Sequence, residues 1–227
     1  MKIGILICGH FSDDLAAIYG TYLDLYAPML GPGFECTPYF VVDGQFPASV
    51  NEQEGWLVSG SRFGAYEDQP WIPPLEDFLR AAYQGDVPTV GICFGHQILA
   101  QALGGTVEKF EGGWSLGPVE YGYKDGASQT VIAVHQDQVT AIPDEANVIV
   151  ATDFCANAGL AYKGRALSFQ PHPEFDKQFI EDLLEAYSVK LAPEIIAAAK
   201  DTLHRPIDNA EMIGQIQVLD VADPWSA

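Results

Sequence analysis

The residue with the clearest potential for covalent chemistry is Cys93, which lies between two glycines in the segment GICFG (residues 91–95). The pattern predicts a strand over residues 89–93 and a helix over residues 96–103, so Cys93 stands at their junction. Small neighbours allow the sharp turn that raises a strained nucleophile above a sheet. A helix N-terminus favours a thiolate and offers free amides to an oxyanion. Because a free cysteine is often a small core residue, a purely structural role is the alternative.

A histidine and a carboxylate end a later β-prone run, in the segment SFQPHPEF (residues 168–175). Side chains two apart in an extended chain point the same way, so Glu174 is expected to orient the imidazole of His172. The flanking prolines suit a strand end, where parallel sheets bind their ligands. A His-x-Glu pair also suits a metal ion, but no third ligand is evident and we expect no metal. Together with Cys93, the pair forms a cysteine, histidine and acid set.

The elements that must position these residues alternate between short Val/Ile-rich runs and longer amphipathic stretches, a pattern typical of strands joined by helical crossovers. Residues 12–26 carry apolar side chains at helical spacing, which predicts a helix with one buried face. From residue 106 to 162 the chain breaks into short β-prone segments separated by turn residues. The other predicted strands are residues 3–8, 37–42, 56–59 and 166–170, and the other helices are residues 75–83, 177–191, 193 to about 203, and about 210–219.

This order of elements predicts an α/β fold: a doubly wound, mostly parallel sheet flanked by helices, with a small antiparallel excursion and a helical C-terminal extension. The 227 residues suit one large core, because single cores remain efficient up to roughly 250 residues. We expect residues 1–190 to form the main domain, and residues 191–227 to be a helical extension of that same domain.

Composition excludes several classes of partner. The net charge of −20 repels phosphate backbones and anionic lipids, so we expect no nucleic acid and no membrane as a partner. The sequence shows no apolar run long enough to span a bilayer and no signal peptide at its start. The four cysteines form no CxxC pair and 48% of residues are hydrophobic, which favours a folded protein of the reducing cytoplasm.

The segments GICFGHQILAQALGG and FQPHPEF, in this order and about eighty residues apart, resemble the class I glutamine amidotransferase family. The resemblance covers residues 1 to about 190. It implies that Cys93 is the nucleophile, that His172 is the general acid and base, and that Glu174 orients His172. It also places an oxyanion hole at the backbone amides of Gly60 and Phe94.

Further residues match family positions that border the substrate pocket. Gln97 corresponds to a side chain that holds the substrate glutamine, although an ordinary helix residue is the alternative. Gly113 and Trp114 resemble a later pocket loop, and His135 begins an H-x-D-x-V pattern of the same kind, with solvated turn residues as the alternative.

The resemblance implies cysteine-dependent hydrolysis of the γ-glutamyl amide of glutamine or of another γ-glutamyl small molecule, with no cofactor. Two alternatives stay open. In the first, the chain is a glutaminase subunit that passes ammonia to a separate synthase. In the second, it is a catalytically idle binding protein. A larger leaving group than ammonia is expected to contact the aromatic side chains of Phe63, Tyr66, Trp71 and Trp114, with ordinary packing as the alternative for each of them.

Overall fold

The computed structural model describes residues 1–164 and 166–217. Within this part a nine-stranded sheet runs in the order β2-β1-β3-β4-β11-β10-β9-β6-β7. The five strands from β2 to β11 are parallel to one another, and each later neighbour is antiparallel. The parallel strands are β1 (Lys2–Leu6), β2 (Glu35–Tyr39), β3 (Gly55–Val58), β4 (Thr89–Ile92) and β11 (Ala166–Phe169).

The antiparallel strands come from the region predicted as an excursion. Four of them extend the main sheet: β6 (Ser115–Tyr123), β7 (Ser128–His135), β9 (Ala146–Ala151) and β10 (Gly159–Tyr162). The remaining two, β5 (Thr106–Lys109) and β8 (Asp137–Ala141), form a separate small sheet. The excursion is therefore mostly a continuation of the main sheet, and the predicted fold class is confirmed.

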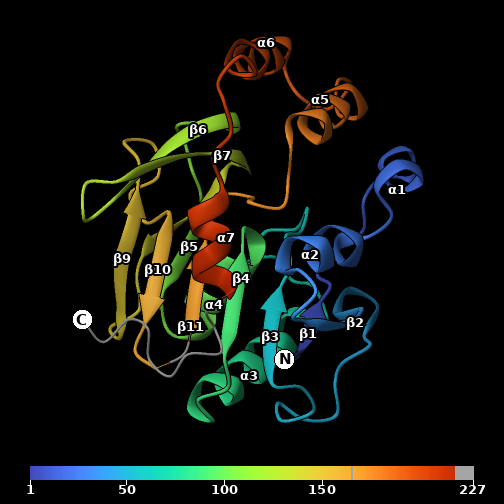
Figure 1. The fold of residues 1–227 in the computed structure, drawn as a ribbon, viewed down its shortest axis with the longest axis vertical. Helices are drawn as coiled ribbons and strands as arrows, with labels where there is room; N and C mark the ends of the chain where they lie inside the picture. Colours follow the sequence, from blue (N-terminus) through green and yellow to red (C-terminus); the bar gives the residue numbers. More distant parts are fainter. Residues whose placement is uncertain (165, 218–227) are drawn as a thin grey trace.

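Helices cover both faces of the sheet (Figure 1). Their bounds are α1 (Asp13–Tyr19), α2 (Tyr22–Leu30), α3 (Ile72–Gln84), α4 (Phe94–Ala102), α5 (Lys177–Ala186), α6 (Pro193–Thr202) and α7 (Ala210–Gln217), with a 3₁₀ turn η1 (Val41–Asp43). Successive side chains of a strand point to opposite faces of the sheet, so alternate residues pack into two hydrophobic cores, one on each face. Leu57 packs with the side chains of α2, α5 and α7, whereas its neighbours Trp56 and Val58 pack with those of α3 and α4.

The predicted single helix over residues 12–26 is wrong, because the structure has two helices there. Gly20 has φ +69° and ends α1, and Thr21 starts α2 through a capping box with Asp24. The change of direction also explains the exposure of Ile18, which is 65% accessible although its spacing predicted burial.

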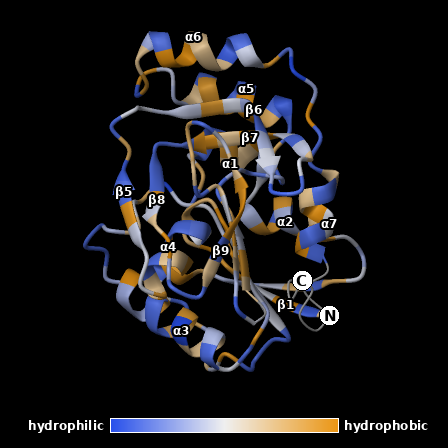
Figure 2. Ribbon diagram, turned by 90° about the vertical axis from the view of Figure 1, so that its left-hand side faces the viewer, coloured by the Kyte–Doolittle hydropathy of each residue, from blue (hydrophilic) through white to orange (hydrophobic). Residues whose placement is uncertain are grey.

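After α6 the chain returns to the core of the molecule through α7. α5 and α6 lie at one end of the molecule, and α3 lies at the opposite end (Figures 1 and 2). α7 then packs against α2, where the side chain of Gln217 donates hydrogen bonds to the carbonyls of Met29 and Leu30. Just before α7, the side chain of Asn209 donates to the carbonyl of Pro173 at 2.6 Å. The predicted last helix extended to residue 219, and residues 218–219 lie outside the described part.

Within residues 1–164 and 166–217, no helix is both long enough and apolar enough to cross a membrane.

Candidate active site

Cys93 lies at the turn between β4 and α4. It is a non-glycine residue with positive φ (φ +54°, ψ −105°), a strained conformation that persists only where the surroundings impose it. Gly95, two residues after the cysteine, allows α4 to start close to β3, because a Cβ at this position would collide with the carbonyl oxygen of Val58. The Cys93 side chain is mostly buried, and its Sγ lies 3.8 Å from the carbonyl oxygen of Val134.

His172 and Glu174 follow β11 and are joined directly. His172 Nδ1 and Glu174 Oε1 are 2.7 Å apart, a short distance typical of a charge-assisted hydrogen bond. The backbone of His172 is fixed as well, because its N–H donates to the carbonyl of Ile132 on β7 at 2.8 Å. Both side chains are buried, with exposures of 3% and 0%.

The electrostatics of His172 follow from three effects. Burial alone lowers the pKa of an imidazole, because it disfavours the charged form. Electrostatic interactions with Glu174 and Cys93, together with hydrogen bonds to both groups, outweigh burial and raise the pKa of His172 to about 10. His172 therefore carries a proton at neutral pH and faces both the cysteine and the carboxylate.

Tyr26 on α2 is a member of the site that the sequence did not reveal. Its hydroxyl donates to Glu174 Oε1 at 3.0 Å, and the amide of Gly60 donates to that hydroxyl at 3.4 Å. The side chain is fully buried, so both groups are held away from water. The only sequence signal is a tyrosine at a predicted buried position of a helix, which more often indicates packing.

The two proposed oxyanion donors come from different segments, the loop after β3 and the start of α4. Gly60 follows β3 and lies against the His172 ring, since a Cβ there would be 3.1 Å from His172 Cε1. Its amide is directed at Tyr26 in this structure. Phe94 is the first residue of α4, and the amides of the first helical turn have no acceptor within the helix.

Gln97 and His135 lie together beside the cysteine. The amide nitrogen of Gln97 donates to the carbonyl of Asp137 at 3.0 Å and to Gln170 Oε1 at 3.1 Å, so Gln97 holds the turn after β7. His135 Nδ1 donates to the same Asp137 carbonyl at 3.2 Å, which leaves Nε2 as an acceptor. Nε2 has no partner among the described residues. Burial lowers the pKa of His135 to about 4, so the ring is neutral.

A cavity of about 320 Å³ connects these groups, a volume at the lower end of the range for ligand pockets. Cys93, Gln97, Trp114, His135 and His172 line it. The other predicted site residues, Glu174, Gly60, Phe94 and Gly113, are not part of its lining.

The predicted aromatic wall is only partly present. Phe63, Tyr66 and Trp114 line the cavity, and Trp114 is 39% exposed. Trp71 is only 5% exposed and packs against Phe63 and Phe94 instead, because it caps the start of α3 inside the core. For Trp71 the structure therefore shows the alternative, ordinary packing.

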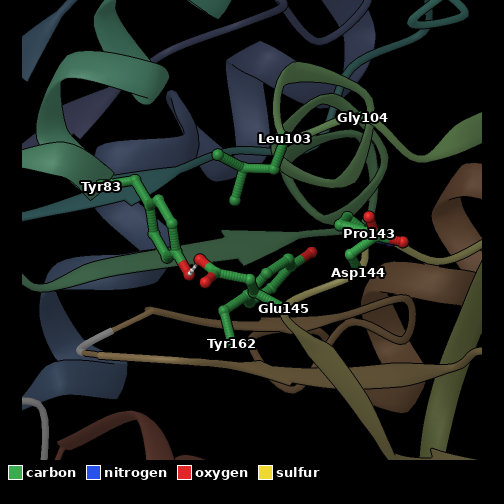
Figure 3. Close-up of a pocket in the computed structure, with 7 residues that line it drawn as sticks. All are labelled: Tyr83, Leu103, Gly104, Pro143, Asp144, Glu145 and Tyr162. Carbon is green, nitrogen blue, oxygen red and sulfur yellow. Dashed lines mark hydrogen bonds between the residues drawn. The ribbon is translucent and has the colours of Figure 1, made fainter.

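A second hollow of about 160 Å³ lies between the end of α3, the end of α4 and the loop before β9 (Figure 3). The Tyr83 hydroxyl donates to Glu145 at 2.9 Å across it, and Lys163 lies 3.6 Å from the same carboxylate. It contains none of the predicted site residues. Among the described residues no group of three or more His, Cys, Asp and Glu side chains is arranged to hold a metal.

The arrangement beside the larger cavity suits acyl transfer: a strained thiol, a protonated imidazole, an acid that orients it, and amides at a helix N-terminus.

Comparisons with known proteins agree on one family. The family model for class I glutamine amidotransferases matches residues 44–184. Gamma-glutamyl peptidase 4 of Arabidopsis thaliana is 30% identical over 183 residues, which cover 74% of this chain and 73% of that protein. The glutamine-hydrolyzing GMP synthase of Aromatoleum aromaticum is 32% identical over 142 residues, covering 53% of this chain and 25% of that protein. A solved glutamine amidotransferase from Thermotoga maritima has the same fold, with a TM-score of 0.72 at 20% identity and coverage of 96% and 94% of the two chains.

Proposed function

Because this chain belongs to the class I glutamine amidotransferase family, we propose that it hydrolyses the γ-glutamyl amide bond of a γ-glutamyl compound or of glutamine through a thioester on Cys93. The chain is an enzyme of the hydrolase or amidotransferase-like type. Its similarity to a protein named gamma-glutamyl peptidase over 74% of its length supports γ-glutamyl hydrolysis.

In the first half of the proposed reaction, Cys93 Sγ attacks the γ-carbonyl carbon and forms a C–S bond. The carbonyl electron pair moves to oxygen, where the amides of Phe94 and Gly60 donate to the oxyanion. The Gly60 amide must turn from the Tyr26 hydroxyl to do so. When the oxyanion collapses, the C–N bond breaks and His172 gives its proton to the departing amine.

In the second half, His172 takes a proton from water, and the resulting hydroxide attacks the thioester. Collapse breaks the C–S bond, releases glutamate and restores Cys93 as a thiolate beside a protonated His172. The hydrogen bond of 2.7 Å between Nδ1 and Glu174 supports this role, because it holds the ring so that its other nitrogen, Nε2, is directed at the cysteine while the proton moves.

The observation that carries the proposal is the convergence of two chain segments on one cavity. Cys93 comes from the β4 to α4 turn and His172 from the end of β11, and both line the same 320 Å³ space. β4 and β11 are adjacent parallel strands, so their carboxyl ends meet at one edge of the sheet.

The test is covalent labelling with an electrophilic glutamine analogue. Mass spectrometry should find the label on Cys93, with little on the other cysteines. Burial raises the pKa of the Cys155 thiol to about 12 and also raises the pKa of the Cys8 and Cys36 thiols. Labelling spread evenly over all four thiols contradicts the assignment. Cys93→Ala should abolish turnover, and Cys155→Ala is the matched control that should keep it.

A second candidate function is a glutaminase that delivers ammonia to a synthase. The similarity to a glutamine-hydrolyzing GMP synthase favours this alternative. The matched region is only 25% of the length of that protein, so there it is part of a much longer chain. Purified protein alone should hydrolyse a γ-glutamyl amide if the hydrolase proposal is right. Complete inactivity until a specific synthase protein is added favours the subunit function instead.

A further inference from the structure

Two sets of side chains line the cavity beside Cys93. One set, the polar wall, comes from the segment after Gly60, from α4 and from the turn after β7, and includes Arg62, Glu67, Gln97, His135 and Asp137 beside the rings of Phe63 and Tyr66. The other set, the apolar wall, comes from the loop before α1, from the segment after His172, and from α5 and the turn that follows it: Phe11, Phe175, Phe179, Leu183, Tyr187 and Leu191.

The apolar wall begins at the imidazole of His172. The Phe175 ring stacks on that imidazole with centroids 4.2 Å apart and planes 9° apart. Phe179 stacks on Phe175 at 3.8 Å, and Phe11 packs against Phe179 at 5.5 Å. Phe175 and Phe179 are themselves buried, with exposures of 3% and 1%, so the half-buried side chains of Phe11, Leu183, Tyr187 and Leu191 carry most of the exposed surface of the apolar wall.

Three polar side chains close to this wall each contact another side chain. The carboxylate of Asp182 on α5 accepts a hydrogen bond of 2.6 Å from Tyr19 on α1. His10, next to Phe11, lies 3.0 Å from Asp43 and points its ring nitrogen at that carboxylate. Lys190 lies over the Tyr187 ring, 4.8 Å from its centroid.

The chemistry of the proposed reaction assigns the two walls to the two parts of a substrate. The γ-glutamyl part carries an ammonium and a carboxylate, which need polar partners when they leave water. The departing nitrogen receives its proton from His172, so the rest of the amine lies on the side of His172. Phe175, which stacks on a face of this imidazole, and Phe179 line the cavity beside it.

We propose that the apolar wall is a leaving-group subsite, and that the preferred substrate is a γ-glutamyl amide of an amine with an apolar, aromatic body. This proposal rests on the proposed γ-glutamyl hydrolysis. An aromatic body gains free energy in proportion to the apolar area that it removes from water. A carboxylate among these apolar side chains loses part of its hydration, and none of the six wall side chains carries a charge to compensate it.

The first experiment compares three substrates with purified full-length protein: γ-glutamyl-phenethylamide, γ-glutamylglycine and glutamine. Phenethylamine and glycine have similar amine basicity, so a difference in rate reports the environment of the amine body. We expect kcat/KM for the phenethylamide to exceed that for γ-glutamylglycine by about tenfold or more, the effect of burying one aromatic side chain. Equal values for the two amides overturn the subsite.

The second experiment changes the wall. Leu191→Lys places a charge on it and should lower the ratio of kcat/KM for the phenethylamide over γ-glutamylglycine by about tenfold. Val189→Lys is the matched control: Val189 is 90% exposed and does not line the cavity, so the ratio should stay at the wild-type value. A ratio that is unchanged by Leu191→Lys contradicts the proposal. Labelling of Cys93 to the wild-type extent shows that each variant is folded.

The outcomes also separate this proposal from the function on which it rests. Hydrolysis of all three substrates without preference rejects the apolar subsite and keeps γ-glutamyl hydrolysis. A lack of hydrolysis together with a lack of labelling at Cys93 rejects both.

Discussion

The imidazole of His172 lies between two acidic groups in a place that water hardly reaches. Burial lowers the pKa of this imidazole, but Glu174 and Cys93 together outweigh burial and raise the pKa from an ordinary value of 6.5 to about 10. Because the pKa of His172 is higher in the folded than in the unfolded protein, protonation of His172 stabilises the folded state. This contribution to the free energy of unfolding is fully present below about pH 6.5 and is lost as pH rises toward 10.

Glu174→Gln should shift the pH dependence of hydrolysis. The wild-type kcat/KM should fall as pH rises through about 10, where His172 loses the proton for the departing amine. Removing the carboxylate lowers that pKa, so the alkaline limb should move to lower pH. Activity at pH 7 should fall at least about 100-fold but stay above that of Cys93→Ala and His172→Ala. An alkaline limb at the same pH in the variant contradicts this account of His172.

Tyr26→Phe should slow catalysis with little effect on substrate binding. It removes the hydroxyl that donates to Glu174 at 3.0 Å, and a hydrogen bond to a charged group contributes about 1.5–3 kcal/mol. We expect kcat to fall about tenfold or more, with KM much less changed.

The matched control for this change is Tyr19→Phe. It also removes a hydrogen bond from a tyrosine to a carboxylate, at 2.6 Å to Asp182, but away from the cysteine. Steady-state kinetics should show a normal kcat for Tyr19→Phe. Equal losses in the two variants indicate a general effect on packing and reject a positioning role for Tyr26.

At the scale of elements, local patterns predicted more than long-range ones. The strand, turn and helix around Cys93 were predictable, because glycine spacing and apolar runs are local signals. The break between α1 and α2 was missed, since it depends on Gly20 and on a capping box that a periodic apolar pattern conceals. The role of Tyr26 was also missed, because its partner Glu174 lies 148 residues away and only the pairing of strands brings them together.

Gly95→Ala should destabilise the protein, although alanine usually stabilises a helix by up to about 1 kcal/mol relative to glycine. The added Cβ would meet the Val58 carbonyl, so α4 must move away from β3. We expect the free energy of unfolding to fall by about 1–3 kcal/mol in urea titrations.

Gly33→Ala is the control for this change, because a Cβ there meets nothing within 4 Å. Its unfolding free energy should equal the wild-type value within about 0.5 kcal/mol. If Gly95→Ala is as stable as Gly33→Ala, the close approach of α4 to β3 does not limit the residue at position 95.

At the scale of the whole molecule, the excess of acidic groups is the main electrostatic feature. The sequence has 31 acidic residues and only 11 lysines and arginines, so there are too few of these cations to pair with most of the carboxylates. Repulsion between unpaired surface charges opposes the compact state and is screened by salt.

Added sodium chloride should therefore raise the melting temperature, measured by circular dichroism between low ionic strength and about 0.5 M. A variant with Glu181→Lys and Glu185→Lys, two exposed positions on α5, reduces the net charge from −20 to −16 and should depend less on salt. An equal salt dependence in both proteins, or a melting temperature that falls with salt, is inconsistent with repulsion as the cause.

The contacts that Asn209 and α7 make with earlier parts of the chain have a consequence for biosynthesis. A ribosome releases Cys93, His172 and Glu174 before it releases Asn209, which contacts the carbonyl of Pro173, and before Gln217, which contacts the helix that carries Tyr26. A nascent chain thus contains every proposed catalytic residue while two of the contacts that fix their supports are still missing. We expect activity to arise only after translation has passed residue 217, which keeps an unfinished chain from cleaving γ-glutamyl compounds.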